Sequence, residues 1–348
     1  MKYKILGRSG LRVSELCLGA MTFGEELGTG ASEAVSRQIY DAYREAGGNF
    51  VDTANIYTLG TSESMTGRFI APERDKIVLA SKYSMATNRQ DPNASGNNRK
   101  NMVQGLEASL KRLNTEYLDL FWVHGWDQIT RIDEIMRGLD DLIRAGKVLH
   151  IGISNFPAWL IAQANTLATE RGLTPFTAVQ MHYNLVERSI ETDFFDLCKA
   201  QDMALLPWSP LAGGLLTGKF NPEAESKADV DARLNKAAYG PAMLAEQRIR
   251  IAQGLAEQAK TVGCTPSQLA LAWLLHRPEG TVIPLLGARK LEQFKDNLGC
   301  LDIQLNQAQI YALDVLAPPP VTYPASLFQT DFYRQMMHGD AEVSPLSR

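Results

Sequence analysis

Several features that would place a chain in other protein classes are missing from this sequence. Its four cysteines lie far apart and form no C-x-x-C pair, which argues against a disulfide framework or a cysteine-rich zinc site. No apolar stretch is long enough for a signal peptide or a membrane-spanning helix. The formal net charge of -4 gives no basic surface for nucleic acid or anionic lipid. We therefore expect a cytoplasmic protein without a nucleic-acid or membrane partner.

The common motifs of metal, hydrolase and dinucleotide sites are missing as well. The five histidines include no H-x-x-x-H or H-x-x-E-H pair, so the sequence predicts no metal site. There is no G-x-S-x-G sequence of the kind that carries a hydrolase serine. The stretches "GRSG" and "GTG" lack the G-x-G-x-x-G spacing of a Rossmann crevice. A nicotinamide cofactor, if one binds, must be held in another way.

What the chain does contain is a regular alternation of short apolar runs and helical patterns, such as residues 99–113, where apolar side chains recur at spacings of four, four and three. Each run is rich in Val, Ile, Leu or aromatic residues, as expected for strands buried on both faces. The eight runs are residues 15–19, 49–54, 76–82, 118–124, 148–154, 178–183, 204–210 and 281–287. Strict alternation predicts a parallel α/β sheet, either open and doubly wound or closed into a barrel. Eight units without a linker rich in Pro, Gly or Ser favour a (β/α)8 TIM barrel.

Three segments depart from the repeat. The chain before the first strand predicts an N-terminal β-hairpin that turns at residues 8–10 and plugs one end of the barrel. A long loop, 211–241, separates the seventh strand from its following helix, and loops of this length are usually functional lids or disordered. The sequence "APPP" (317–320) ends the pattern. We therefore expect one barrel domain, 1–317, and a C-terminal tail, 318–348, that packs on the outside or is partly mobile.

Nearly every predicted strand becomes polar at its C-terminal end, which is the rim where barrel enzymes hold their sites. Asp52 and Lys82 end neighbouring strands, and a desolvated carboxylate is tolerated only when it is paired. An adjacent ammonium would lower the pKa of Tyr57 and make it a usable general acid, with His124 holding a carbonyl oxygen. Taken singly, these residues are a helix cap, an exposed cation and a core histidine. Together at consecutive strand ends they favour a catalytic site.

Six sequences occur in an order that resembles the aldo-keto reductase family. They are "FVDTANIY", "ASKY", "YLDLFWVHGWD", "IGISNF", "WSPLAGGLLTGK" and "GARKLEQFKDNL". The resemblance covers about 1–317, and the aryl-alcohol dehydrogenase and potassium-channel β-subunit branches look most similar. It implies a (β/α)8 barrel that reduces aldehydes or ketones to alcohols with NADPH, in a reversible hydride transfer that forms NADP+. Tyr57 would be the proton donor, Lys82 and Asp52 the pair that lowers its pKa, and His124 the residue that orients the carbonyl.

The resemblance also implies a cofactor site along the rim. Trp208 would stack on the nicotinamide ring, while the segment 208–219 covers the pyrophosphate and Arg289 meets the 2′-phosphate. Arg233, in the long loop, is a weaker phosphate candidate. The full expected set is Gly19, Ala20, Met21, Asp52, Ser154, Asn155, Gln180, Trp208, Ser209, Pro210, Leu211, Gly213, Lys219, Gly287, Arg289, Gln293, Asp296 and Asn297.

Substrate recognition is less well specified by the sequence. Candidate pocket residues are Met21, Tyr57, His124 and Trp126, with the lid and the tail aromatics Phe328, Phe332 and Tyr333 as further walls. The partner is a small carbonyl or alcohol, while the substrate, the preferred direction and homo-oligomerisation stay open.

His182 stands where relatives commonly carry an acidic residue, and the sequence assigns it no role. The leading alternative function is a nicotinamide-binding, redox-sensing regulatory subunit that resembles channel β-subunits. A hydrolase or isomerase that shares only the barrel is the second alternative.

Overall fold

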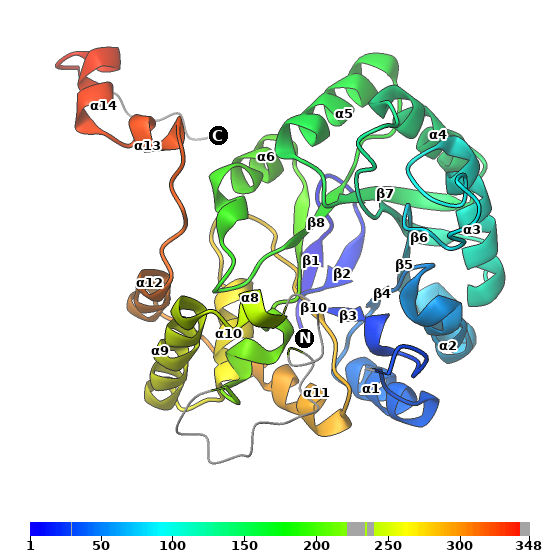
Figure 1. The fold of residues 1–348 in the computed structure, drawn as a ribbon, viewed down its shortest axis with the longest axis horizontal. Coiled ribbons are helices and arrows are strands. Elements are labelled where there is room, and N and C mark those ends of the chain that lie inside the picture. Colours follow the sequence, from blue (N-terminus) through cyan, green and yellow to red (C-terminus); the bar gives the residue numbers. More distant parts are fainter. Residues whose placement is uncertain (29, 221–233, 235–239, 342–348) are drawn as a thin grey trace.

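The fold is a barrel of parallel strands surrounded by helices. The computed structural model describes residues 1–28, 30–220, 234 and 240–341 (Figure 1). Its barrel strands are β3 (Cys17–Gly19), β4 (Phe50–Asp52), β5 (Val78–Tyr83), β6 (Leu118–Val123), β7 (Val148–Ser154), β8 (Ala178–His182), β9 (Ala204–Trp208) and β10 (Leu285–Leu286). They pair in the order β10-β3-β4-β5-β6-β7-β8-β9. A parallel bridge between Leu205 and Val282 brings the two ends of the sheet together, which confirms the (β/α)8 barrel.

The last strand is shorter than the apolar run that predicted it. Only Leu285–Leu286 is a strand within the expected segment 281–287. Pro284 lacks an N–H and cannot donate to a ladder, although its carbonyl accepts from the backbone of Cys17 at 3.0 Å. The chain on either side of Val282 still contacts β9, because Leu205 donates to Thr281 at 2.8 Å and accepts from Ile283 at 2.9 Å.

The predicted N-terminal hairpin is present. β1 (Tyr3–Ile5) pairs antiparallel with β2 (Arg12–Ser14). Leu6 and Val13 are fully buried and join a core cluster that includes strand residues such as Phe50 and Trp122. The hairpin therefore covers one end of the barrel with apolar side chains.

The helices surround the strands as the repeat predicts. They are α1 (Glu33–Glu45), α2 (Thr61–Ile70), α3 (Arg99–Leu113), α4 (Ile132–Arg144), α5 (Ala158–Arg171), α6 (Phe194–Ala200), α8 (Gly240–Met243), α9 (Glu246–Val262), α10 (Pro266–Leu275), α11 (Leu291–Leu298) and α12 (Gln307–Leu316). α3 has the bounds that its apolar spacing indicated. Its N-cap, Asn98, accepts a hydrogen bond from the backbone of Asn101, and the helix ends at Asn114 in a left-handed conformation. No helix within the described ranges has the length and apolar composition needed to cross a membrane.

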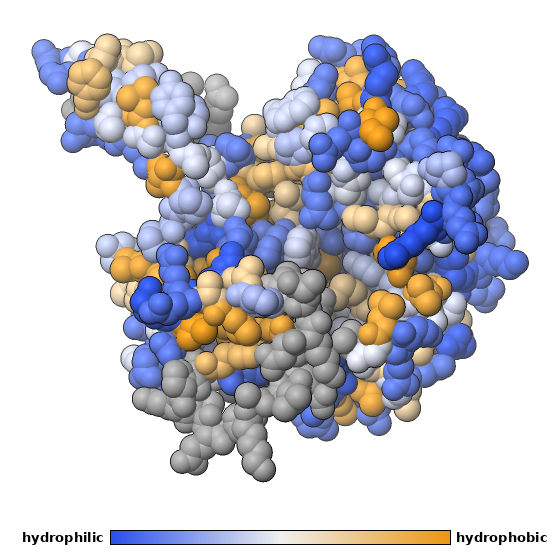
Figure 2. All heavy atoms as spheres, in the orientation of Figure 1, coloured by the Kyte–Doolittle hydropathy of each residue, from blue (hydrophilic) through white to orange (hydrophobic). Residues whose placement is uncertain are grey.

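The C-terminal tail leaves the barrel. Its helices α13 (Ala325–Phe328) and α14 (Asp331–His338) project away from the barrel (Figure 1). Phe328 packs against Tyr333, with ring centroids 5.3 Å apart, and Phe332 is 67% exposed. Figure 2 shows this lobe with apolar atoms on its surface. In this structure these aromatic side chains lie in the projecting lobe, and their place in the substrate pocket stays a prediction.

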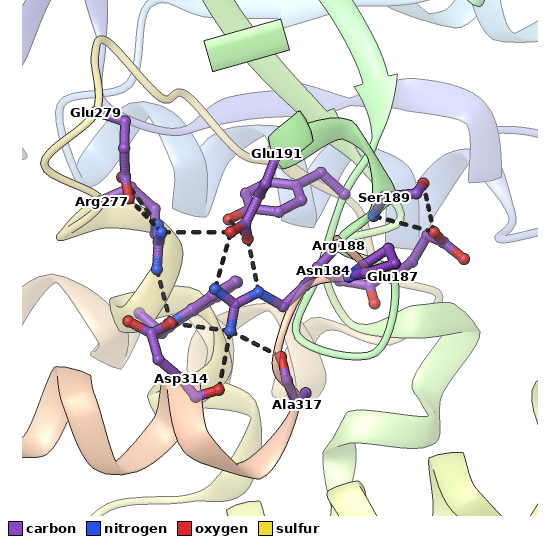
Figure 3. Close-up of polar contacts among 12 residues, drawn as sticks. Asn184, Glu187, Arg188, Ser189, Glu191, Arg277, Glu279, Asp314 and Ala317 are labelled. Atoms are coloured by element: carbon purple, nitrogen blue, oxygen red, sulfur yellow. Dashed lines mark hydrogen bonds and ion pairs between the residues drawn. The ribbon is translucent and has the colours of Figure 1, made fainter. Parts of the chain in front are cut away.

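A buried ion network joins the chain after β8 to the last helices of the barrel (Figure 3). Arg188 and Arg277 each lie against the ring of Trp273, with guanidinium carbons 5.2 and 4.9 Å from its centroid. Arg188 pairs with Glu191 at 2.6 Å and with Asp314 at 3.0 Å. It also donates to the carbonyl of Ala317 at 2.8 Å, which fixes the end of α12.

This network predicts a large loss of stability when its arginine is removed. Arg188→Met should lower the free energy of unfolding by about 3 kcal/mol or more, because Glu191 and Asp314 would lose a buried partner. Urea unfolding followed by circular dichroism measures the change. Arg37→Met is the matched control, since Arg37 pairs with Asp41 at a site where both side chains are nearly half exposed. Equal losses in the two variants would contradict the prediction.

Candidate active site

The centre of the site is a buried ion pair formed by the ends of β4 and β5. Asp52 is 1% exposed and Lys82 is fully buried. The Lys82 ammonium donates to the Asp52 carboxylate, to the carbonyl of Thr53 at 2.8 Å and to the hydroxyl of Tyr57 at 3.2 Å. A lysine ammonium has three N–H donors, and all three are used here. The pair is therefore both charge-balanced and satisfied in its hydrogen bonds.

The electrostatics of this pair reflect burial and mutual attraction. Burial alone would lower the pKa of Lys82, but the charge of Asp52 and the contact with Tyr57 raise it. Burial raises the pKa of Asp52, while contact with the Lys82 ammonium opposes that rise. The Gln180 side-chain amide also donates to Asp52 at 3.3 Å. We take Lys82 to be cationic at neutral pH, because its pKa is raised and its acceptors are already in place.

Tyr57 is held at the rim by an unusual turn. It begins a 3-10 segment, η2 (Tyr57–Gly60), in which Thr58 and Leu59 have positive φ angles of 44° and 57°. The hydroxyl of Thr58 donates to the carbonyl of Phe23 at 2.6 Å and ties this turn to the chain after β3. Side chains rarely adopt such φ values without compensation. The turn therefore keeps the half-buried Tyr57 against Lys82.

His124 approaches Tyr57 from the end of β6. The two rings meet edge to face, with centroids 5.8 Å apart. The backbone of His124 donates to the Tyr83 carbonyl at 3.0 Å and to the Ser84 hydroxyl at 3.2 Å. Its Nδ1 atom is buried and has no hydrogen-bond partner among the residues that the structure describes. Burial first, and the charge of Lys82 second, lower the pKa of His124 to about 3, so the imidazole is neutral at physiological pH.

A chain of neutral polar groups continues around the rim. The amide nitrogen of Asn155 donates to the carbonyl of His124 at 2.9 Å and to the hydroxyl of Ser154 at 3.0 Å. Ser154 in turn donates to the carbonyl of Gln180 at 2.8 Å. The oxygen of Asn155 accepts from the indole of Trp208 at 3.1 Å. Donors and acceptors thus alternate beside the ion pair, as a carboxamide ligand requires.

The segment after β9 is a turn of left-handed residues beside a cation. Ser209, Ala212, Gly213 and Gly214 all have positive φ angles within or beside the 3-10 segment η5 (Ala212–Thr217). A side chain at Gly214 would meet the Lys219 ammonium at 2.9 Å, so that cation lies directly on the glycine backbone. The N–H groups of Ala212, Gly213 and Gly214 donate within the turn, to the Ser209 carbonyl at 2.9 Å, the Ser209 hydroxyl at 3.2 Å and the Leu211 carbonyl at 2.9 Å. The ammonium of Lys219 is therefore the group that could meet an anion. The residues present therefore fit a cofactor phosphate.

The remaining predicted cofactor residues fall into two groups. A side chain at Gly287 would lie 2.9 Å from the carbonyl of Gly19, so this close contact between β3 and the chain after β10 requires glycine. Arg289 precedes α11, as expected, with exposed Gln293 and buried Asn297 on that helix. The rest of the set, Ala20, Met21, Pro210 and Leu211, follows the ends of β3 and β9.

Asp296, the other predicted residue of α11, makes structural contacts. Its carboxylate accepts from Thr265 at 3.1 Å and from Gln268 at 3.0 Å, at the N-terminus of α10. These bonds connect α10 with α11 and occupy the carboxylate. The geometry therefore favours a structural role for Asp296 over a direct contact with adenosine.

The expected substrate wall is aromatic. Trp126 packs on Phe156 and meets Trp159 edge to face, with centroids 6.2 and 6.1 Å apart. Trp159 is 62% exposed and was not predicted, because its place on α5 gives no motif. Met21 is 39% exposed beside β3. Most of the expected lid 211–241, including Arg233, lies outside the described residues.

Three further contributions to the site were missed by sequence reasoning. The Thr53 carbonyl holds Lys82, but a backbone acceptor leaves no trace in the sequence. The Asn184 side chain donates to the carbonyl of Ser209 at 3.0 Å. The ring of His182 stacks on Trp208, with centroids 4.2 Å apart. The parallel register of β8 and β9, which pairs these two residues, was the signal that could have revealed the stack.

The neutrality of His124 is testable. Because its pKa is lowered to about 3, its ring signals should not titrate between pH 5 and 8 in histidine-labelled NMR spectra. The unfolded chain takes up this proton near pH 6.5 and the native protein does not, so His124 costs stability progressively as the pH falls from 6.5 toward 3. His124→Gln assigns the resonance and should remove this part of the pH dependence. A midpoint near 6.5 would contradict the burial argument.

Most of the chain is similar to known proteins. Residues 15–317 match the sequence profile described as "Aldo/keto reductase family". A norsolorinic acid reductase of Aspergillus flavus is 36% identical over 94% of this chain and 84% of its own length. An aryl-alcohol dehydrogenase [NADP(+)] of Phanerodontia chrysosporium is 35% identical over 92% and 86% of the two chains. A putative aryl-alcohol dehydrogenase of Saccharomyces cerevisiae is 32% identical over 95% and 90%.

Proposed function

Because the chain belongs to the aldo/keto reductase family and is an oxidoreductase, we propose that it reduces aldehydes or ketones to alcohols with NADPH and uses Tyr57 as proton donor. The observation that supports this most directly is the contact between the Tyr57 hydroxyl and the satisfied, buried ammonium of Lys82. An ammonium beside a phenol favours loss of the phenolic proton. The same contact stabilises the phenolate that remains after the proton has moved.

Each residue of the site has a distinct task in this proposal. The neutral imidazole of His124 can donate one hydrogen bond to a carbonyl oxygen placed beside Tyr57. Tyr57 delivers its proton to that oxygen, and Asp52 keeps Lys82 charged throughout. Bound NADPH would supply the hydride. Preorganised donors at a developing oxyanion stabilise the transition state by roughly 3 kcal/mol in comparable sites.

The cofactor would be held by groups of matching chemistry. Ser154, Asn155 and Gln180 would bind the carboxamide, and Trp208 would support the nicotinamide ring. The glycine turn with Lys219 would hold the pyrophosphate, and Arg289 would meet the 2′-phosphate. The names of the relatives, which refer to aryl alcohols and norsolorinic acid, agree with an aromatic wall at Trp126. We therefore propose aryl aldehydes and aryl ketones as the first substrates to test.

Removal of one hydroxyl tests the proton donor. Tyr57→Phe should bind NADPH as tightly as the wild type but lose at least about a hundredfold in kcat, because general acid catalysis typically contributes that much. Calorimetric titration and the absorbance of reduced nicotinamide measure the two quantities. Tyr311→Phe, on an exposed face of α12, is the control. Full activity of Tyr57→Phe would disprove the assignment. Wild-type binding without turnover on any carbonyl would favour the regulatory alternative.

The cofactor preference depends on Arg289. Arg289→Leu should weaken NADPH binding by about tenfold or more and leave NADH binding nearly unchanged, because a charged hydrogen bond to phosphate would be lost. Lys290→Leu is the matched control: it removes the same charge from the exposed neighbouring position. If both variants lose NADPH affinity equally, the effect is one of general charge, and Arg289 does not recognise the 2′-phosphate.

A further inference from the structure

The stack of His182 on Trp208 places a second aromatic ring behind the indole of the rim. The two residues are direct partners in the parallel register of β8 and β9, so both side chains leave the sheet on the same side. Their ring centroids are 4.2 Å apart and their planes differ by 9°. His182 therefore covers one face of the Trp208 indole. Any ligand ring that stacks on this indole must use the other face.

Hydrogen bonds fix both rings in place. The Trp208 indole donates to the oxygen of Asn155 at 3.1 Å. The Nε2 atom of His182 lies 3.2 Å from the amide nitrogen of Asn184. The orientation of that amide is set by the backbone, because its nitrogen donates to the Ser209 carbonyl at 3.0 Å and its oxygen accepts from Val186 at 3.0 Å.

The same bonds define the protonation state of His182. The Asn184 amide nitrogen is a donor only, so Nε2 of His182 must offer a lone pair and cannot carry a proton. A proton on Nε2 would place an N–H donor of His182 against the N–H donor of the Asn184 amide. Burial lowers the pKa of His182, Arg248 lowers it further and Glu187 opposes them. Arg248 and Glu187, whose effects on His182 are opposite, pair with each other at 3.0 Å. The ring behind Trp208 is thus neutral.

We propose that His182 is a positioning residue whose neutral ring supports the Trp208 indole and keeps the rim from favouring the oxidised, cationic nicotinamide over the reduced one. This inference rests on the proposed function, because it assumes that Trp208 contacts the nicotinamide. The indole separates the two rings but screens charge poorly. A negative charge at position 182 would attract a cationic nicotinamide through it, and a neutral imidazole does not.

Support of the indole is tested by removing the stack and restoring it. His182→Ala should weaken the binding of both NADPH and NADP+ by about two- to tenfold in calorimetric titrations. The loss of an aromatic stack that holds the indole in place has an energy of this size. His182→Phe restores a neutral ring and should recover the wild-type affinities. Wild-type binding by the alanine variant, or failure of phenylalanine to rescue a variant that melts like the wild type, would overturn the positioning role.

Neutrality is tested by a pair of variants that differ in charge alone. His182→Glu should tighten NADP+ relative to NADPH by on the order of tenfold, as expected for opposite charges separated by stacked rings. His182→Gln should leave the ratio of the two dissociation constants within about twofold of the alanine variant. If the ratio of the NADP+ and NADPH dissociation constants is unchanged in the glutamate variant, the inference is overturned. The proposed function still stands in that case, provided that the wild type binds the cofactor and turns over. A wild-type protein that binds neither cofactor would overturn the proposed function together with this inference.

Discussion

A fully buried ammonium is tolerated at the centre of this barrel because three acceptors surround it. Lys82 contacts the carboxylate of Asp52, the carbonyl of Thr53 and the hydroxyl of Tyr57. Removal of any acceptor would leave a buried donor unsatisfied. The buried ammonium therefore places two requirements on the backbone. Strands β4 and β5 must keep their register so that the ion pair can form, and the turn at Tyr57 must keep its strained φ angles to supply the third acceptor.

The charge of Lys82 also contributes to the neutrality of His124. It contributes, after burial, to the low pKa of His124, so the imidazole beside Tyr57 remains a hydrogen-bond donor and acceptor and does not become a second cation. Farther along the rim, Asn155 links the carbonyl of His124 to the indole of Trp208. One amide therefore couples the residues proposed for proton transfer to the platform proposed for the cofactor.

The sequence predicted those features that depend on the periodicity of strands and helices and on which side chains lie at the strand ends. The barrel, the hairpin, the bounds of α3 and the meeting of Asp52 with Lys82 were all predictable from periodicity and alternation. Features that depend on the backbone or on tertiary contacts were not. Pro284 shortened the last strand, the carbonyl of Thr53 completed the lysine site, and Asp296 was found to connect α10 and α11.

The distribution of charge along the rim agrees with a ligand that is itself divided into a neutral and an anionic part. Near the ion pair, the groups are uncharged amides, hydroxyls and aromatic rings, and His182 extends that neutral region behind Trp208. Beyond β9 the character changes, since the cation Lys219 lies on a turn of left-handed glycines. A nicotinamide dinucleotide has this order of chemistry from its ring to its phosphates. The neutral end has a second consequence for the proposed function: neither His124 nor His182 would place a charge beside a bound ring, and the charges of Lys82 and Asp52 are opposite in sign. Under that proposal, such a site would not itself favour the oxidised cofactor, and a single carboxylate at position 182 would be enough to change that balance.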